Sequence, residues 1–215
     1  MITITEPATL ATDYLLALFT GWLGRRLLLA SRIAEWNGLV EAAGAQHWWS
    51  VAFMATAVAG AAGGTVHGFQ QTMARPVTNL LWIATLESLI VAAFAVVSTA
   101  IVMIGWRRTA TFATTFTAAV ALSSYGLWVA KHPVFLAAIA AYGVALAMLL
   151  AIRLVRVRPL DRGGRFLIAG IVVSVIAAAV QQSGWSLHPK FNHNDLYHVI
   201  QAVGVWLLYR SAMNP

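Results

Sequence analysis

The sequence has few charged residues and no cysteine. Asp, Glu, Lys and Arg make up 10% of its 215 residues, and 60% are hydrophobic, whereas soluble domains carry about 25% charged residues. This composition excludes a soluble globular protein. The lack of cysteine excludes disulfides and thiolate metal sites. The opening MITITEP has no basic residue before the first apolar segment, so we expect no cleavable signal peptide.

Long apolar runs predict an all-α polytopic membrane protein, a bundle of seven transmembrane helices in a single domain, 1–215. Such runs need about 20 residues to cross a bilayer core of ~30 Å, and their backbone must satisfy its hydrogen bonds internally. The expected spans are 8–29, 48–69, 78–105, 110–130, 134–155, 165–183 and 194–211. The first has only a short uninterrupted stretch before the pair Arg25-Arg26, and that stretch contains Asp13. The segment after it, Leu27 to Glu41, is expected to be a separate amphipathic piece at the membrane interface.

Basic residues are distributed unevenly between the two ends of these spans. Eleven of the 14 fall at one end and three at the other. The larger group is Arg25, Arg26, Arg32, Arg107, Arg108, Arg153, Arg156, Arg158, Arg162, Arg165 and Arg210, and the smaller is Arg75, Lys131 and Lys190. The positive-inside rule then predicts an outside N-terminus and a cytoplasmic C-terminus, in a bacterial inner membrane. Topology therefore explains the net charge of +7, and no nucleic-acid partner is expected.

Polar side chains gather at the predicted outer face. Five of the six histidines lie there, and only His47 lies on the cytoplasmic side. His67 ends the second span, after Gly63 and Gly64, which would admit another helix or a ligand. Asp13 lies near the outer end of the first span. Ionisable groups inside a membrane are costly, so each one indicates a partner or a function.

The start of the seventh span carries the densest polar motif. Asp195 and Asn194 precede His198 by three and four residues, so they project to one side of a helix, and Gln201 continues that stripe. His193 can converge with His198 only from the cap region. An Asp/His pair joined by a histidine from another helix could hold zinc. The alternative is that these residues are helix caps and interfacial hydrogen-bonding groups.

Glu87 is the one acid deep within a span, ~15 Å from its start at 1.5 Å per residue. We expect it to be protonated, or to pair with Ser88, Tyr125 or Gln181. A structural hydrogen bond and a proton-relay role both remain open for Glu87. Asp13, Asn194 and Gln201 are further structural or relay candidates.

These motifs resemble those of the seven-helix membrane hydrolases that include alkaline ceramidases and the progestin/adipoQ receptors. In that superfamily a Ser-x3-His lies on the second helix, an aspartate on the third and a His-x3-His at the start of the seventh. His67 and His198 match two of those histidines. The serine position falls on Gly63 and the first histidine position on Asn194, with His193 one residue away, and the third helix has Glu87 as its only acid in place of the aspartate. The segment from Phe191 to Gln201 also resembles a motif of uncharacterised bacterial membrane proteins.

The resemblance implies zinc held by histidines, hydrolysis of a lipid amide, and second and seventh helices lying side by side. One hypothesis is thus a metal-dependent hydrolase acting on a lipid amide or ester at the outer face. His67, His193 and His198 would bind zinc, and Asp195 would be catalytic or would replace His193. A second is a non-catalytic accessory or binding subunit that contacts lipid or other membrane subunits. A third is a b-type haem protein with His67 and a seventh-helix histidine as axial ligands.

Overall fold

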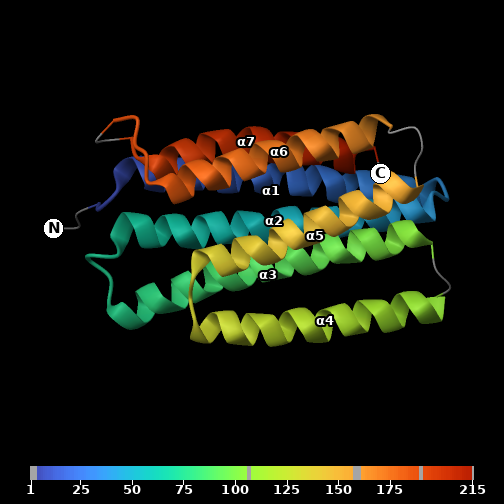
Figure 1. Cartoon of the computed structure of the whole chain (residues 1–215), viewed down its shortest axis with the longest axis horizontal. Coiled ribbons are helices and arrows are strands. Elements are labelled where there is room, and N and C mark those ends of the chain that lie inside the picture. Colours follow the sequence, from blue (N-terminus) through green and yellow to red (C-terminus); the bar gives the residue numbers. More distant parts are fainter. Residues whose placement is uncertain (1–3, 106–107, 157–160, 189–190, 215) are drawn as a thin grey trace.

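Seven long helices, running alternately in opposite directions, make up the chain (Figure 1). The computed structural model describes residues 4–105, 108–156, 161–188 and 191–214. The helices are α1 (Pro7–Trp36), α2 (Val40–Phe69), α3 (Arg75–Ile104), α4 (Arg108–Lys131), α5 (Phe135–Arg156), α6 (Arg162–Ser183) and α7 (His193–Ala212). The predicted all-α seven-helix bundle is therefore confirmed.

Five of these helices, α2 to α6, are long and apolar enough to cross a membrane. Helices α1 and α7 fall below that hydropathy because polar residues interrupt them. Asp13 and the pair Arg25-Arg26 lie in α1, and Asp195 and His198 lie in α7. The protein is thus an integral membrane protein with five candidate spans.

The expected interfacial segment from Leu27 to Glu41 does not exist as a separate element. Helix α1 continues through it to Trp36, and α2 begins at Val40, eight residues before the expected start at 48. Leu27 is fully buried, and the buried Ser31 hydroxyl donates to the carbonyl of Ala43 on α2 at 2.8 Å. The buried residues of this stretch, such as Leu27, Ser31 and Ala34, therefore pack inside the bundle, whereas Ile33 and Trp36 are exposed.

Glycines on α2 bring α1 and α2 unusually close together. Gly60 and Gly64 are four residues apart and face α1. A Cβ on Gly64 would lie 2.6 Å from the Cβ of Asp13, and one on Gly60 would lie 3.3 Å from that of Ala17. Small residues permit such close backbone approach between helices in a bilayer. This packing holds Asp13 on the side of α1 that faces the interior of the bundle.

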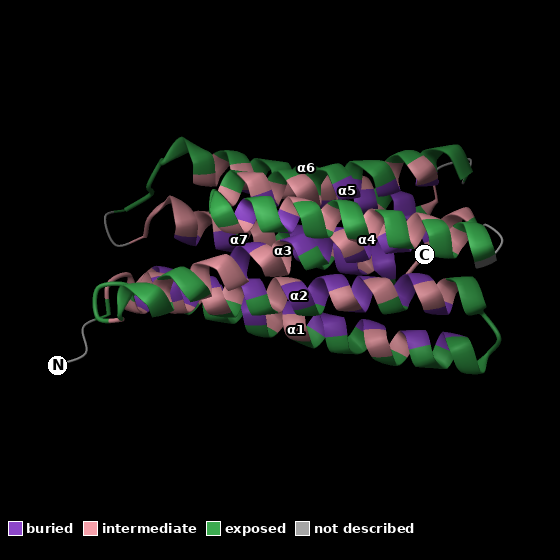
Figure 2. Ribbon diagram, turned by 90° about the horizontal axis from the view of Figure 1, so that it is seen from below, coloured by how far each residue is buried: buried purple, intermediate pink, exposed green. Residues whose placement is uncertain are grey.

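Helix α1 lies between α2 and α7, which barely touch each other. The side-by-side arrangement of α2 and α7 that the resemblance implies is therefore wrong. Helix α6 packs on α7, whereas α5 packs on α3, so the consecutive helices α5 and α6 make little contact. Helix α4 lies at the edge of the bundle and packs mainly on α3 (Figure 1). Buried residues are concentrated on the inner faces of the helices, as Figure 2 shows.

Candidate ligand-binding cavity

A cavity of about 650 Å³ lies inside the bundle, and every described helix except α4 contributes to its wall. Most of the wall is apolar, with side chains such as Phe53, Leu89, Ile139 and Leu146. On α7 the lining extends from His193 to Leu208, a length of ~22 Å at 1.5 Å per residue. The cavity is therefore an elongated space parallel to the helices, with polar groups gathered toward the start of α7.

Asp13 and His198 form the buried polar end of this cavity. His198 Nε2 lies 3.0 Å from Asp13 Oδ1, and His198 Nδ1 lies 2.9 Å from the Thr12 hydroxyl. Asp13 and His198 are only 5% and 7% exposed. The second carboxylate oxygen of Asp13, Oδ2, is buried and has no hydrogen-bond partner among the described residues. The structure thus joins α1 to α7 through the contacts of Asp13 and Thr12 with His198 and leaves a carboxylate oxygen unused.

His67 reaches a second polar cluster at the start of α1. Its Nδ1 atom lies 3.5 Å from Glu6 Oε2. That oxygen also accepts from the Thr9 hydroxyl at 3.1 Å and from the Asn192 amide at 3.5 Å. His67, His193 and His198 all line the same cavity, and the start of α1 contacts two of them, His67 through the N-cap Glu6 and His198 through Asp13.

Asp195 caps helix α7. Its Oδ2 atom accepts from the backbone N–H of Asn192 at 2.6 Å, and the Asn192 side chain accepts from the N–H groups of Asn194 and Asp195. This reciprocal arrangement is a capping box. Asp195 is buried but is not among the residues that line the cavity. Its catalytic role stays a prediction.

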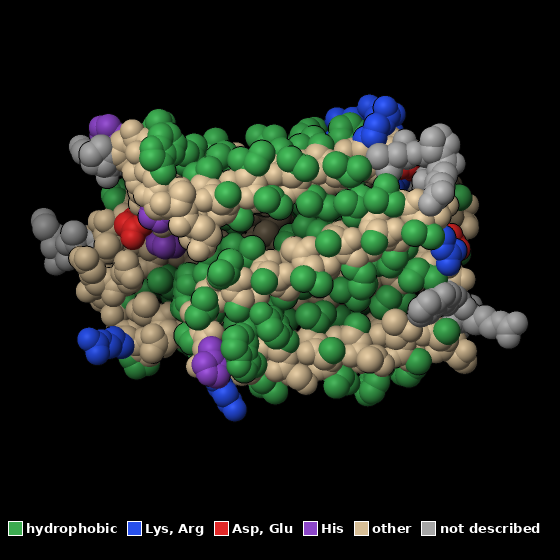
Figure 3. Space-filling view, in the orientation of Figure 1, with side chains coloured by type: hydrophobic (Ala, Val, Ile, Leu, Met, Phe, Trp, Pro, Cys, Tyr) green, Lys and Arg blue, Asp and Glu red, His purple; other side chains and the backbone are tan. Residues whose placement is uncertain are grey.

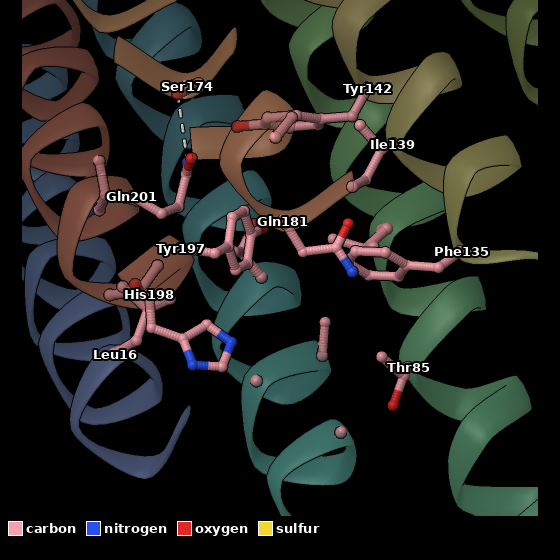
Figure 4. Close-up of a pocket in the computed structure, with 18 of the residues that line it drawn as sticks. Leu16, Thr85, Phe135, Ile139, Tyr142, Ser174, Gln181, Tyr197, His198 and Gln201 are labelled. Atoms are coloured by element: carbon pink, nitrogen blue, oxygen red, sulfur yellow. Dashed lines mark hydrogen bonds between the residues drawn. The ribbon is translucent and has the colours of Figure 1, made fainter. Parts of the chain in front are cut away.

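Helices α6 and α7 are tied together by amides along the cavity. Gln201 donates to the Ser174 hydroxyl at 3.2 Å, and Gln181 donates to Asn194 Oδ1 at 3.5 Å. Figure 4 shows Gln181 and the rings of Tyr142 and Tyr197 pointing into the same space, from α6, α5 and α7. Asn194 and Gln201 therefore have structural partners and also line the cavity.

Glu87 lies apart from the cavity, on the side of α3 that faces α4. The expected pairing with Tyr125 or Gln181 is wrong, because Tyr125 donates to the Ala137 carbonyl and Gln181 donates to Asn194. The Glu87 carboxylate packs against Gly126, where an added Cβ would lie 2.6 Å from Oε2. Its Oε1 atom is buried with no hydrogen-bond partner in the described part of the chain. The sequence identified Glu87 as a carboxyl inside a span, but it did not show that the carboxyl packs against Gly126 of α4.

Glu6 and Thr12 are the site residues that the sequence analysis missed. Glu6, the N-cap of α1, and Thr9 and Asp13 within the helix follow the spacing i, i+3, i+7, which directs them toward one side of a helix. That polar stripe was the available signal.

The donors at this end of the cavity do not fit a zinc ion as the structure places them. Within the described ranges, no group of three or more histidine, aspartate or glutamate side chains is arranged to hold a metal. Both ring nitrogens of His198 already face Thr12 and Asp13. His132, another histidine expected on this face, lies at the end of α4, with its Nδ1 atom 3.0 Å from the carbonyl of Trp128.

Fold and cavity together define a helical membrane protein with a ligand-sized internal space and a buried acid–histidine pair. The chain belongs to a family of unknown function, DUF6962, which it matches over residues 8–215. No curated protein and no solved structure matches it. The family carries no assigned activity, so the likeness to the ceramidase and progestin/adipoQ receptor superfamily stays a prediction.

Proposed function

We propose that this protein binds an amphipathic, lipid-like molecule within the membrane. The observation that carries this proposal is the cavity of about 650 Å³ with apolar walls and the buried Asp13–His198 pair at one end. Small-molecule sites measure about 300–1,000 Å³ and combine apolar walls with a few oriented polar groups. A long apolar space with one polar end matches a molecule with an apolar chain and a polar head.

The gap between α5 and α6 offers such a molecule a route from the bilayer. In the orientation of Figure 1, the surface is hollowed between these two helices (Figure 3). Gly143 and Ala147 of α5 line the cavity and are exposed, and Val175 of α6 lines it from the other side. Apolar side chains surround this opening, so it favours entry from hydrocarbon over entry from water.

We further propose that all seven helices cross the membrane, with the polar end of the cavity toward the outside of a bacterial inner membrane. Support comes from the 11-to-3 distribution of basic residues and from the alternating direction of the helices. The polar side chains of α1 and α7 face each other and the cavity, which reduces the cost of carrying them through a bilayer.

Blocking the opening tests the binding function. A Cβ at Gly143 meets no atom within 4 Å, so Gly143→Phe should fold and place its ring in the gap. Val144→Phe is the matched control, because Val144 is 70% exposed and does not line the cavity. Both proteins would be purified in the same detergent, and bound lipid would be extracted and measured by mass spectrometry.

We expect the parent and Val144→Phe to retain a lipid at a fixed ratio to protein, and Gly143→Phe to retain much less. Equal lipid content in the two variants would reject the opening and the cavity as the binding site. A parent protein that carries no lipid, and gains none when purified lipid extract is added, would reject the function itself.

A metal-dependent lipid hydrolase is the second candidate. The observation that favours it is that His67, His193 and His198 line one cavity. Zinc binding would require His67 to leave Glu6 and His198 to leave Thr12 or Asp13. Metal analysis of the purified protein tests this candidate, which predicts about one zinc per chain. An absorption spectrum of the same sample tests the haem hypothesis through a Soret band, with His67 and His193 or His198 as ligands.

A further inference from the structure

We propose that the polar end of the cavity recognises a protonated amine, so that the ligand is an amphiphile with a cationic head. This inference rests on the proposed binding function and specifies the ligand class. The apolar part of the ligand would extend along the cavity toward Leu208, and the ammonium group would bind the free oxygen of Asp13.

The unused carboxylate oxygen is the first support. Asp13 lines the cavity and is 5% exposed. Its Oδ1 atom faces His198, and its Oδ2 atom is buried with no partner among the described residues. A buried polar atom left without a hydrogen bond is destabilising. An N–H donor from a ligand would satisfy Oδ2 without disturbing the contact with His198.

The charge of the lining is the second support. None of the described residues that line the cavity is a lysine or an arginine. Recognition of phosphate, sulfate or carboxylate heads usually relies on those cations. At this end of the cavity the carboxylates of Glu6 and Asp13 lie against His67 and His198, and the carboxyl of Asp195 is buried in the same turn of α7 as His193. A cationic head therefore fits the charge better than an anionic one.

Other polar side chains of the cavity lining offer further acceptors for such a head. The Thr85 hydroxyl, the Tyr197 phenol and the Asn194 amide all belong to the lining. Thr85 donates its hydroxyl proton to the Leu81 carbonyl, so its oxygen remains able to accept. An ammonium group carries up to three N–H donors, and one carboxylate with two or three neutral acceptors could satisfy them.

Three single-chain amphiphiles of equal chain length test this inference, namely a primary amine, an alcohol and a carboxylic acid. Binding would be measured by calorimetry on the full-length protein in phosphatidylcholine nanodiscs, with empty nanodiscs subtracted. The amine should bind the parent about tenfold or more tightly than the alcohol, as expected for a hydrogen bond to a charged partner. The acid should bind most weakly.

Asp13→Asn should lose the preference for the amine while still binding the alcohol, which shows that the variant is folded. Glu87→Gln is the matched control, because it removes a membrane carboxyl that does not line the cavity. It should keep the preference. Equal affinity for all three amphiphiles, tighter binding of the acid, or an amine preference that survives in Asp13→Asn would overturn the amine assignment alone. Failure of all three to bind would count against the proposed function.

Discussion

At the scale of single residues, Asp13 depends on a neighbour that has no side chain. Gly64 of α2 faces it so closely that an added Cβ would lie 2.6 Å from the Asp13 Cβ and 3.2 Å from the Tyr14 ring. The first of these contacts involves an atom attached directly to the α1 backbone, so a larger residue at 64 must push the two helices apart. The position of the Asp13 carboxylate in the cavity is therefore set by a glycine on another helix.

Gly64→Ala should destabilise the protein by about 1–3 kcal/mol, because overpacking a close helix contact has that typical cost. Gly143→Ala is the control, since its Cβ would meet nothing within 4 Å and alanine favours a helix over glycine. Melting temperatures in detergent would be compared. Similar melting temperatures for the two variants would mean that α1 and α2 are not packed as described.

At the scale of helices, the N-terminus of α6 is tied to α5 and to the end of α7. Arg153 is 2% exposed and donates to both carboxylate oxygens of Asp161, at 3.2 and 2.6 Å, and to the Asn214 carbonyl at 2.6 Å. Asp161 Oδ1 also accepts from the Gly164 N–H as the N-cap of α6. These contacts join the ends of three helices opposite the polar end of the cavity.

Asp161→Asn keeps a good N-cap but removes the charge that Arg153 faces. We expect the free energy of unfolding to fall by about 1–2 kcal/mol at neutral pH. This is less than for a fully buried pair, because the Asp161 side chain is 38% exposed. The hydrogen bond from Arg153 lowers the pKa of Asp161 below its ordinary 3.8.

The pH dependence of this pair follows from that lowered pKa. The pair stabilises the folded state fully above the ordinary pKa and loses its effect as the pH falls through the lower, folded-state pKa. The difference in melting temperature between the parent and Asp161→Asn should therefore be constant near neutral pH and shrink below about pH 3.8. A difference that does not change with pH would show that charge is not its cause.

Helix number followed from the sequence because each apolar run is long and is bounded by polar or helix-breaking residues. The positions at which the first helix ends and the second begins did not follow from the sequence. The sequence around Leu27 and Ser31 is amphipathic when it is considered alone. Only the contact with Ala43 shows that its buried face packs on α2. Hydropathy measures what a segment contains and not what covers it, so it cannot separate an interfacial helix from a packed one.

At the scale of the whole molecule, the polar residues could be found but not their pairing. His67 and His198 were identified from their depth and spacing, and both line the cavity. The group that faces each of them comes from the start of α1, the N-cap Glu6 for His67 and Asp13 for His198. The order in which helices pack is a property of the assembled bundle, and no local spacing specifies that α1 lies between α2 and α7.

The orientation of this bundle decides which compartment the acid–histidine pair faces, and single cysteines can test it because the chain has none of its own. Ser186→Cys lies in the exposed loop before α7, and Arg156→Cys lies at the exposed end of α5. A membrane-impermeant maleimide added to intact cells should label the first and not the second, and should label both after permeabilisation. Ile4→Cys, 43% exposed ahead of α1, should behave like Ser186→Cys if α1 crosses.

Labelling of Arg156→Cys alone would reverse the orientation and turn the polar end of the cavity toward the cytoplasm. Protection of Ile4→Cys, with Ser186→Cys labelled, would mean that α1 does not cross, and Asp13 would then lack the membrane position that the binding proposal gives it.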